Sequence, residues 1–218
     1  MKKALIFANG KRKDGIMVHR ALDEAFDASI IVADGGVRIA LKYNLVPDAI
    51  IGDMDSVDHE ILKQLEATGV VIQHYPQEKN ETDLELALSY AAEHGAQWIR
   101  IIGGIGGRFD QMLANVYLLA LPQLANRDVA IVAGKQSICL LREGENIVVG
   151  QEGDTVSLIP ISGDVCGITT YGLKYALQND TLLFGPARGV SNVLLGDTAK
   201  IIIDTGYLLC VHTVGNPD

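Results

Sequence analysis

Acidic residues recur in short segments of the N-terminal two-thirds of the chain. Asp53 and Asp55 stand two residues apart, and Asp83 opens a later helical pattern. In an extended segment, residues two apart project to the same side, so we expect the first two carboxylates to share a cation and Asp83 to supply a third ligand. Mg²⁺ prefers few carboxylates, several waters and phosphate oxygens. The pattern predicts a Mg²⁺ site that handles a phosphorylated substrate, although a single Asp-x-Asp more often only caps a helix.

A glycine-rich segment, residues 103–107, follows a predicted strand and precedes a predicted helix. Backbone N–H groups can approach a phosphate closely there because no Cβ is in the way. Arg108 comes next and can add charge-assisted hydrogen bonds, although a surface arginine without a ligand is an equally good interpretation of this residue alone. The segment lacks the Lys-Ser/Thr of a P-loop and the third glycine of the dinucleotide fingerprint. It favours phosphate binding of an unspecified kind.

A dense turn near the C-terminus, residues 185–192, carries small hydroxyl and amide side chains. On spacing alone, a tight hairpin connection is the better interpretation, and ligand contact is the alternative. Tyr171, Tyr175 and Phe184 stand nearby, and each is expected to be a core residue more often than a platform for a planar ligand.

The elements that must position these residues change in character along the chain. Up to about Gly134, short apolar runs alternate with helical periodicity, which predicts a parallel sheet covered on both faces. The expected strands are Ala4–Ala8, Ser29–Ala33, Ala49–Ile51, Val70–His74, Trp98–Ile102 and Val129–Ala133. The expected helices are Ile16–Phe26, Val37–Tyr43, Asp58–Thr68, Asp83–His94 and Phe109–Leu121. Ligands bind at the carboxyl ends of such strands, where the acidic and glycine-rich segments stand.

One helix boundary is especially well marked. Thr82 and Glu85 have the spacing of a capping box, and Gly95 is expected to end the helix. Asp83 then lies in the first turn, where a carboxylate is held near an electropositive helix end.

After Lys135 the helical patterns stop and short β-like runs follow, separated by Gly, Asp and Asn turns. Such spacing is typical of a β-sandwich or small barrel. We therefore predict an α/β catalytic domain over residues 1–135 and an all-β domain over residues 136–218.

Composition excludes several classes of function. The chain has 218 residues, 48% hydrophobic and 21% charged, with a net charge of −9. A charge of this sign disfavours nucleic acid and anionic membranes as partners. No run approaches the roughly 18 apolar residues that cross a bilayer, so we expect a cytoplasmic protein. Cys139, Cys166 and Cys210 are widely spaced in apolar surroundings and are expected to be reduced, buried thiols.

Taken together and in order, these segments resemble the thiamin pyrophosphokinase (thiamine diphosphokinase) family. The matching pieces are Asp34-Gly35-Gly36, Pro47-Asp48, Gly52-Asp53-Met54-Asp55-Ser56, Lys79-Asn80-Glu81-Thr82-Asp83, residues 103–111 with Asn115, and Arg188-Gly189-Val190-Ser191-Asn192. The resemblance implies an N-terminal α/β domain, a C-terminal β-sandwich, and a homodimer with active sites shared between chains. It also implies that ATP and thiamine give AMP and thiamine diphosphate. Asn80 and Gln111 depart from the Asp and His common at these positions.

The resemblance also implies roles for individual residues. The catalytic set is Asp53, Asp55, Asp83, Arg108 and Asp110, of which the first three bind Mg²⁺. The ATP-binding set is Asp34, Gly35, Thr82, Gly104, Arg108 and Gln111. Ser191 and Asn192 are expected to contact thiamine. The proton acceptor is either Asp110 or Asp83.

Two other functions stay open at this point. The same aspartates would serve another Mg²⁺-dependent nucleotide pyrophosphotransferase or a pyrophosphohydrolase. A non-catalytic nucleotide-sensing module is the second alternative, but a sensor has no need to hold three mutually repelling carboxylates together.

Overall fold

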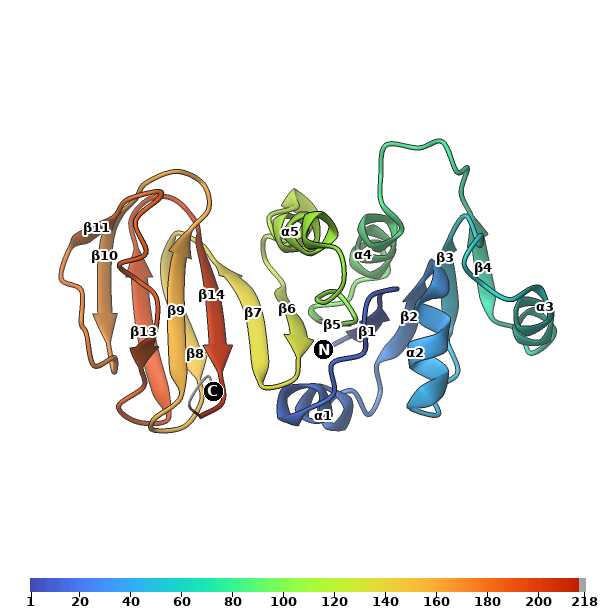
Figure 1. Ribbon diagram of the computed structural model, residues 1–218, viewed down its shortest axis with the longest axis horizontal. Helices are drawn as coiled ribbons and strands as arrows, with labels where there is room; N and C mark the ends of the chain where they lie inside the picture. Colours follow the sequence, from blue (N-terminus) through green and yellow to red (C-terminus); the bar gives the residue numbers. More distant parts are fainter. Residues whose placement is uncertain (216–218) are drawn as a thin grey trace. The chain divides into compact units, whose positions relative to one another are not determined.

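The computed structural model describes residues 1–215 and divides into two compact units. The first is Met1–Gly134 and the second begins at Lys135 (Figure 1). The division falls one residue from the boundary expected from the sequence.

The first unit contains a parallel sheet whose strands lie in the order β6-β5-β1-β2-β3-β4. The strands are β1 (Lys3–Phe7), β2 (Ser29–Ala33), β3 (Ala49–Gly52), β4 (Val71–His74), β5 (Trp98–Ile102) and β6 (Asp128–Ala133). Consecutive residues of the central strands are buried, as in β1, where residues 4–7 all lie in the core. Such continuous apolar runs are what a sheet covered on both faces requires. The predicted fold class is confirmed for this unit.

Helices cover both faces of this sheet. They are α1 (Ile16–Glu24), α2 (Val37–Lys42), α3 (His59–Ala67), α4 (Asp83–Glu93) and α5 (Phe109–Leu118), with short 3₁₀ turns at Asp34–Gly36 and Pro122–Leu124. Figure 1 shows α4 and α5 on one side of the strands and α1 on the other. Thr82 Oγ1 accepts a hydrogen bond from Glu85 N at 3.2 Å, so α4 begins at the predicted cap. Gly95, with φ of 83°, follows the end of the helix.

The order of the strands reverses at β1. From β1 the chain builds outward through β2, β3 and β4, and then returns to add β5 and β6 on the other side of β1. The connections that leave β1 and β5 therefore diverge, which opens a crevice at the carboxyl edge of the sheet.

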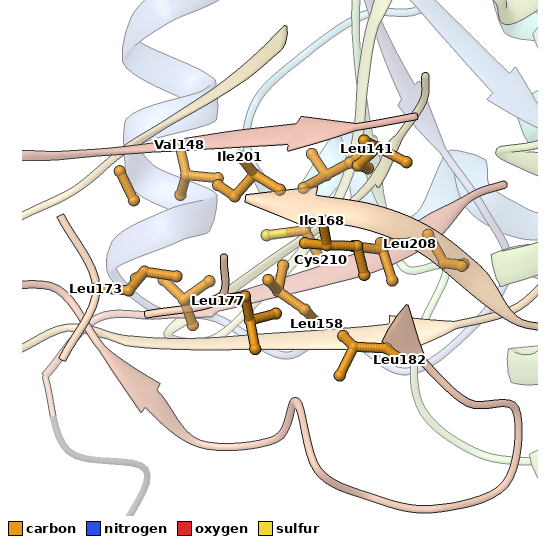
Figure 2. Close-up of a cluster of buried hydrophobic side chains, with 14 of the residues drawn as sticks. Leu141, Val148, Leu158, Ile168, Leu173, Leu177, Leu182, Ile201, Leu208 and Cys210 are labelled. Carbon is orange, nitrogen blue, oxygen red and sulfur yellow. The ribbon is translucent and has the colours of Figure 1, made fainter. Parts of the chain in front are cut away.

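The second unit consists of two antiparallel sheets, with orders β12-β9-β14-β7 and β11-β10-β13-β8. The strands are β7 (Gln136–Leu141), β8 (Gly144–Val149), β9 (Thr155–Pro160), β10 (Val165–Tyr171), β11 (Asp180–Leu182), β12 (Asn192–Val193), β13 (Thr198–Ile203) and β14 (Leu208–Thr213). Figure 2 shows Leu158 and Leu208 from the first sheet close to Ile168 and Ile201 from the second, within one apolar core. This arrangement confirms the predicted β-sandwich.

A buried acid–histidine pair lies in the second unit. Asp154 Oδ2 lies 2.7 Å from His212 Nε2, and both side chains are almost wholly buried. Asp154 also accepts hydrogen bonds from the backbone N–H groups of Gln151 and Gly215. Burial alone would raise the pKa of Asp154, but the bonds from Gly215, His212 and Gln151 together hold that pKa below its ordinary value.

Because this carboxylate is stabilised in the folded protein, Asp154→Asn is expected to lower the free energy of unfolding at pH 7 by about 3 kcal/mol. A lowered pKa contributes stability above the pKa of the unfolded chain and loses it as the pH falls through the folded value. The difference between wild type and variant should therefore narrow below about pH 4. Urea titrations of both proteins at pH 7 and at pH 3.5 measure this difference in unfolding free energy. A difference that is the same at both pH values would contradict its attribution to the Asp154 carboxylate.

The cysteines depart in part from expectation. None of the three, all within the described residues, forms a disulfide bond, but only Cys210 is buried, while Cys139 is half-buried and Cys166 is exposed. Cys166 lies in β10, where alternate residues point away from the core, and its position among apolar neighbours in the sequence concealed this. No helix within residues 1–215 has the length and apolar character needed to cross a lipid bilayer.

Candidate active site

Three carboxylates converge at the carboxyl edge of the parallel sheet. One oxygen from each of Asp34, Asp53 and Asp83 lies within 4.8 Å of the others. Asp34 follows β2, Asp53 follows β3, and Asp83 is the first residue of α4. Gly52 makes the approach possible, because a Cβ there would lie 3.0 Å from Asp83 Cγ and 3.1 Å from Asp34 Cβ. Two of the three predicted metal ligands are thus brought together, with Asp34 as the third member of the cluster.

Asp55 lies outside that cluster, and the expected extended Asp-x-Asp geometry is wrong. Met54, between the two aspartates, has φ of 64°, so the chain turns there. The Asp55 carboxylate is exposed and accepts hydrogen bonds from Ser56 Oγ at 2.9 Å and from Gln77 Nε2 at 3.1 Å. These bonds, the one from Ser56 first, lower the pKa of Asp55. A carboxylate with a lowered pKa keeps its negative charge.

Negative charge in the cluster is only partly balanced. Lys79 Nζ lies 2.9 Å from Asp83 Oδ1 and 4.0 Å from Asp53 Oδ2. Burial raises the pKa of Asp83, and Lys79 opposes that shift. Asp83 Oδ1 is buried with Lys79 as its one close cation among the described residues, and Asp34 is 4% exposed. Hard, charged oxygen atoms crowded in this way fit a divalent cation such as Mg²⁺.

Strained backbone marks the same segments. Among the described residues, the non-glycine residues with positive φ are Asp34, Asn44, Met54, Asn179 and Ser191. Asparagine and aspartate adopt this conformation comparatively readily, whereas methionine and serine adopt it at a cost of about 1–3 kcal/mol. Met54 and Ser191 both stand in segments that the sequence singled out, and such strain is commonly retained at functional sites.

A cavity of about 700 Å³ opens over the cluster in the first unit. This volume suits a nucleotide-sized ligand. Its polar lining includes Asn9, Lys11, Asp34, Asp53, Asp55, Ser56, Thr82, Asp83, Gly104, Arg108, Gln111 and Asn115. Gly35 and Asp110, two further predicted residues, do not line it. Gly35 instead packs closely against the Asn9 side chain.

Arg108 and Asp110 form an exposed ion pair, in which Arg108 Nε donates to Asp110 Oδ1 at 3.1 Å. The hydrogen bonds from Arg108 lower the pKa of Asp110. Asp110 is therefore a poor proton acceptor while it is paired with Arg108. To bind a phosphate through the same nitrogen atoms, Arg108 would first have to separate from Asp110.

Two lining residues on the β1 connection, Asn9 and Lys11, were not predicted from the sequence. Asn9 Oδ1 accepts a hydrogen bond from Arg38 at 2.9 Å. Neither residue belongs to a recognisable motif. The signal that identifies their segment is the reversal of strand order at β1, which requires the topology.

The predicted thiamine-contacting turn lies in the second unit. Asn192 is 8% exposed, and its amide accepts from Tyr175 N at 2.9 Å and donates to Tyr175 O at 2.8 Å. The Asn192 side chain thus holds the Tyr175 backbone in place. A cavity of about 280 Å³ is lined by Leu158, Tyr175, Ala176, Leu177, Arg188, Gly189, Val190 and Asn192. Ser191 does not line this cavity, and its N–H donates to Ser157 Oγ.

The expectation that the three aromatic residues are core is wrong. Tyr171 is 55% exposed, and Tyr175 and Phe184 are each 62% exposed. Side chains of this size on the surface of a β-sandwich are available to a ligand or a partner.

A doubly wound α/β unit with an acidic, glycine-rich cavity at its strand-order reversal belongs to the class of phosphate-handling α/β proteins. Comparison with known families narrows this class. The "thiamin pyrophosphokinase, catalytic domain" model matches residues 19–132, and the "vitamin B1 binding domain" model of the same proteins matches residues 141–208. The chain belongs to the thiamin pyrophosphokinase family, as its sequence motifs indicated, and is an enzyme of that type.

Individual relatives agree with the assignment. The chain is 29% identical to the thiamine pyrophosphokinase of Bacillus subtilis over 184 residues, which are 84% of this chain and 86% of that protein. It is 27% identical to thiamine pyrophosphokinase 1 of Oryza sativa over 189 residues, which are 82% of this chain and 70% of that protein. The crystal structure of the B. subtilis thiamine pyrophosphokinase superposes with a TM-score of 0.85 at 28% identity, covering 98% of this chain and 99% of that one.

Proposed function

We propose that this chain transfers the β,γ-diphosphoryl group of ATP to the hydroxyl group of thiamine, giving thiamine diphosphate and AMP. The observation that carries the proposal is the Asp34, Asp53 and Asp83 cluster beneath a nucleotide-sized cavity, in a chain matched by both domains of the family.

Asp53, Asp55 and Asp83 are proposed to hold Mg²⁺, with Asp34 as a fourth carboxylate beside them. The crowded carboxylate oxygens support this assignment. When bound, the cation would neutralise and orient phosphate oxygens. Four residues are proposed to surround the ATP phosphates and ribose: Thr82, Gly104, Arg108 and Gln111. Gly35 acts behind them, where its lack of a side chain allows the Asp34 segment to approach Asn9.

In the proposed reaction, the hydroxyl oxygen of thiamine forms a bond to the β-phosphorus in line with the bond that breaks. AMP leaves with the bridging oxygen, and the hydroxyl proton passes to a carboxylate. Asp110 and Asp83 are the two proposed acceptors: Asp110 would first have to separate from Arg108, and Asp83 would have to accept the proton while it lies beside the cation. Positioning and charge neutralisation supply most of the rate enhancement in such transfers.

The second unit is proposed to bind thiamine through the turn that contains Ser191 and Asn192. The cavity beside this turn and the exposed Tyr175 ring support the assignment, because an aromatic face attracts a cation such as the thiazolium. We also propose a homodimer in which the turn of one chain completes the site of the other. A cytoplasmic location, and partners that include neither nucleic acid nor membrane, stay predictions from composition.

One assay tests the reaction. Purified protein with MgATP and thiamine should form thiamine diphosphate and AMP in equal amounts. Release of AMP and diphosphate at full rate without thiamine would show a pyrophosphohydrolase. Formation of ADP with thiamine monophosphate would show transfer of the γ-phosphoryl group, and binding of nucleotide without turnover would show a sensing module.

A further inference from the structure

The cavity of the first unit is lined by Lys11, whose ammonium group forms no ion pair with a described neighbouring side chain. Lys11 and Arg108 are the basic residues that line it, and Arg108 is paired with Asp110. Lys79, next to the acidic cluster, is paired with Asp83. Within residues 1–215, Lys11 has neither an ion pair nor a side-chain hydrogen bond, so its ammonium group is available to a ligand.

The backbone that carries Lys11 is fixed against the glycine-rich segment. Gly10 N donates to Gly103 O at 3.0 Å, and Ala8 N donates to Ile102 O at 2.8 Å. A Cβ at Gly106 would lie 3.0 Å from Lys11 Cβ, so the two segments are in close contact. Residues 8–15 and 103–108 are the connections that leave β1 and β5, between which the strand order reverses. Lys11 thus stands at the position where α/β sheets bind ligands.

The excess of negative charge in the cavity favours a role for Lys11 in binding an anionic ligand. Four aspartates line the cavity, the whole chain carries a net charge of −9, and a nucleotide polyphosphate is itself strongly anionic. A divalent cation at the aspartates offsets part of this repulsion. A free ammonium group on the opposite connection offsets more of it, since a lysine binds phosphate as a point charge.

We propose that Lys11 contacts the polyphosphate of the bound nucleotide and is a specificity-determining residue for a polyphosphate over a monophosphate. The inference rests on the proposed function only for the nucleotide and does not depend on thiamine as the acceptor.

Lys13 provides a matched control. It stands on the same connection, is exposed and carries the same charge; its Cε would lie 3.4 Å from a Cβ at Gly106, but Lys13 does not line the cavity. Arg12 is less suitable, because its guanidinium lies 3.7 Å from Asp14 and over the Tyr43 ring. Substituting either lysine with methionine removes one positive charge and keeps most of the aliphatic stem.

The test measures the binding of MgATP and of magnesium tripolyphosphate by calorimetry, without thiamine. Lys11→Met is expected to raise both dissociation constants about tenfold or more, as for loss of a charge-assisted hydrogen bond. Lys13→Met should raise them about twofold or less, because this lysine does not line the cavity and its charge is exposed to solvent. Lys11→Arg should bind both ligands almost as tightly as the wild type. Lys11→Met should raise the dissociation constant of AMP by a smaller factor than that of MgATP.

Equal weakening in Lys11→Met and Lys13→Met would overturn the proposal, because it would show a general effect of charge. Unchanged binding in Lys11→Met would overturn it as well. If the wild-type protein binds MgATP but forms no thiamine diphosphate, the reaction fails and the Lys11 comparison can still be made. If the wild-type protein does not bind MgATP, both proposals are wrong. Thermal melting of each variant checks that the fold is intact.

Discussion

Asp53→Asn is expected to lower the rate of thiamine diphosphate formation by on the order of a thousandfold, because it removes a charged ligand where phosphate charge must be balanced. The change keeps the shape of the side chain, and it relieves repulsion with Asp34 and Asp83, which lie within 4.8 Å. The melting temperature in the absence of metal should therefore stay the same or rise. Turnover and thermal melting, measured on the same preparation, test both halves of this expectation.

Two companion variants distinguish the ligand sets. The sequence assigns Asp55 with Asp53 and Asp83, whereas the structure groups Asp34 with them. Binding of Mn²⁺, followed by electron paramagnetic resonance, should weaken strongly in Asp53→Asn. A larger loss in Asp34→Asn than in Asp55→Asn would support the set in the structure, and the reverse order would support the set from the sequence. Near-normal turnover of Asp53→Asn at limiting Mg²⁺ would rule out the metal assignment altogether.

The elements of the first unit were predictable because burial on both faces of a parallel sheet demands continuous apolar runs. Ser29–Ala33 and Trp98–Ile102 were predicted with the bounds that the structure has. The start of α4 was predictable for a different reason, since the Thr82 cap is a local hydrogen bond between residues three apart. In both cases the information lies within a few residues of the chain.

The details of the site depend on long-range geometry, which local patterns do not contain. Asp34 joins the cluster because β2 and β3 are neighbours, and Asp55 leaves it because the backbone turns at Met54. A positive φ at methionine has no signature in the sequence. Lys11 lines the cavity only because β5 pairs with β1, although eight elements separate these two strands in the sequence.

Exposure in the second unit was also hard to predict. Each strand of a sandwich has one buried and one outer face, and a one-residue shift in phase exchanges them. Tyr175 illustrates a further difficulty, because it lies outside the strands and its backbone is held by the amide of Asn192, 17 positions later. The motif that contains Asn192 was recognised, but the tyrosine that it positions was not assigned to the site.

The proposed shared active site predicts that two inactive variants restore activity when they are combined. One variant is Asp53→Asn, and the other carries a lesion in the second unit. Asn192→Ala removes the amide that holds Tyr175, and because that amide is buried, its fold must be checked by melting. Tyr175→Ala is a second choice that does not threaten the core, since the ring is 62% exposed.

The two variants are produced together with different affinity tags, and the mixed dimers are isolated by successive purification on both tags. A two-fold dimer has two equivalent sites. If each site takes its aspartates from one chain and its thiamine-binding turn from the other, a mixed dimer contains one doubly damaged site and one intact site. It should then show about half the activity of a wild-type dimer. Two wild-type chains with the same tags provide the reference, and dimers of each single variant provide the background.

If every site is built within a single chain, each site in the mixed dimer carries one lesion, and the preparation stays as inactive as the two single variants. Isolation of a dimer that carries both tags but has no activity would therefore support the proposed dimer and contradict the proposed shared active site.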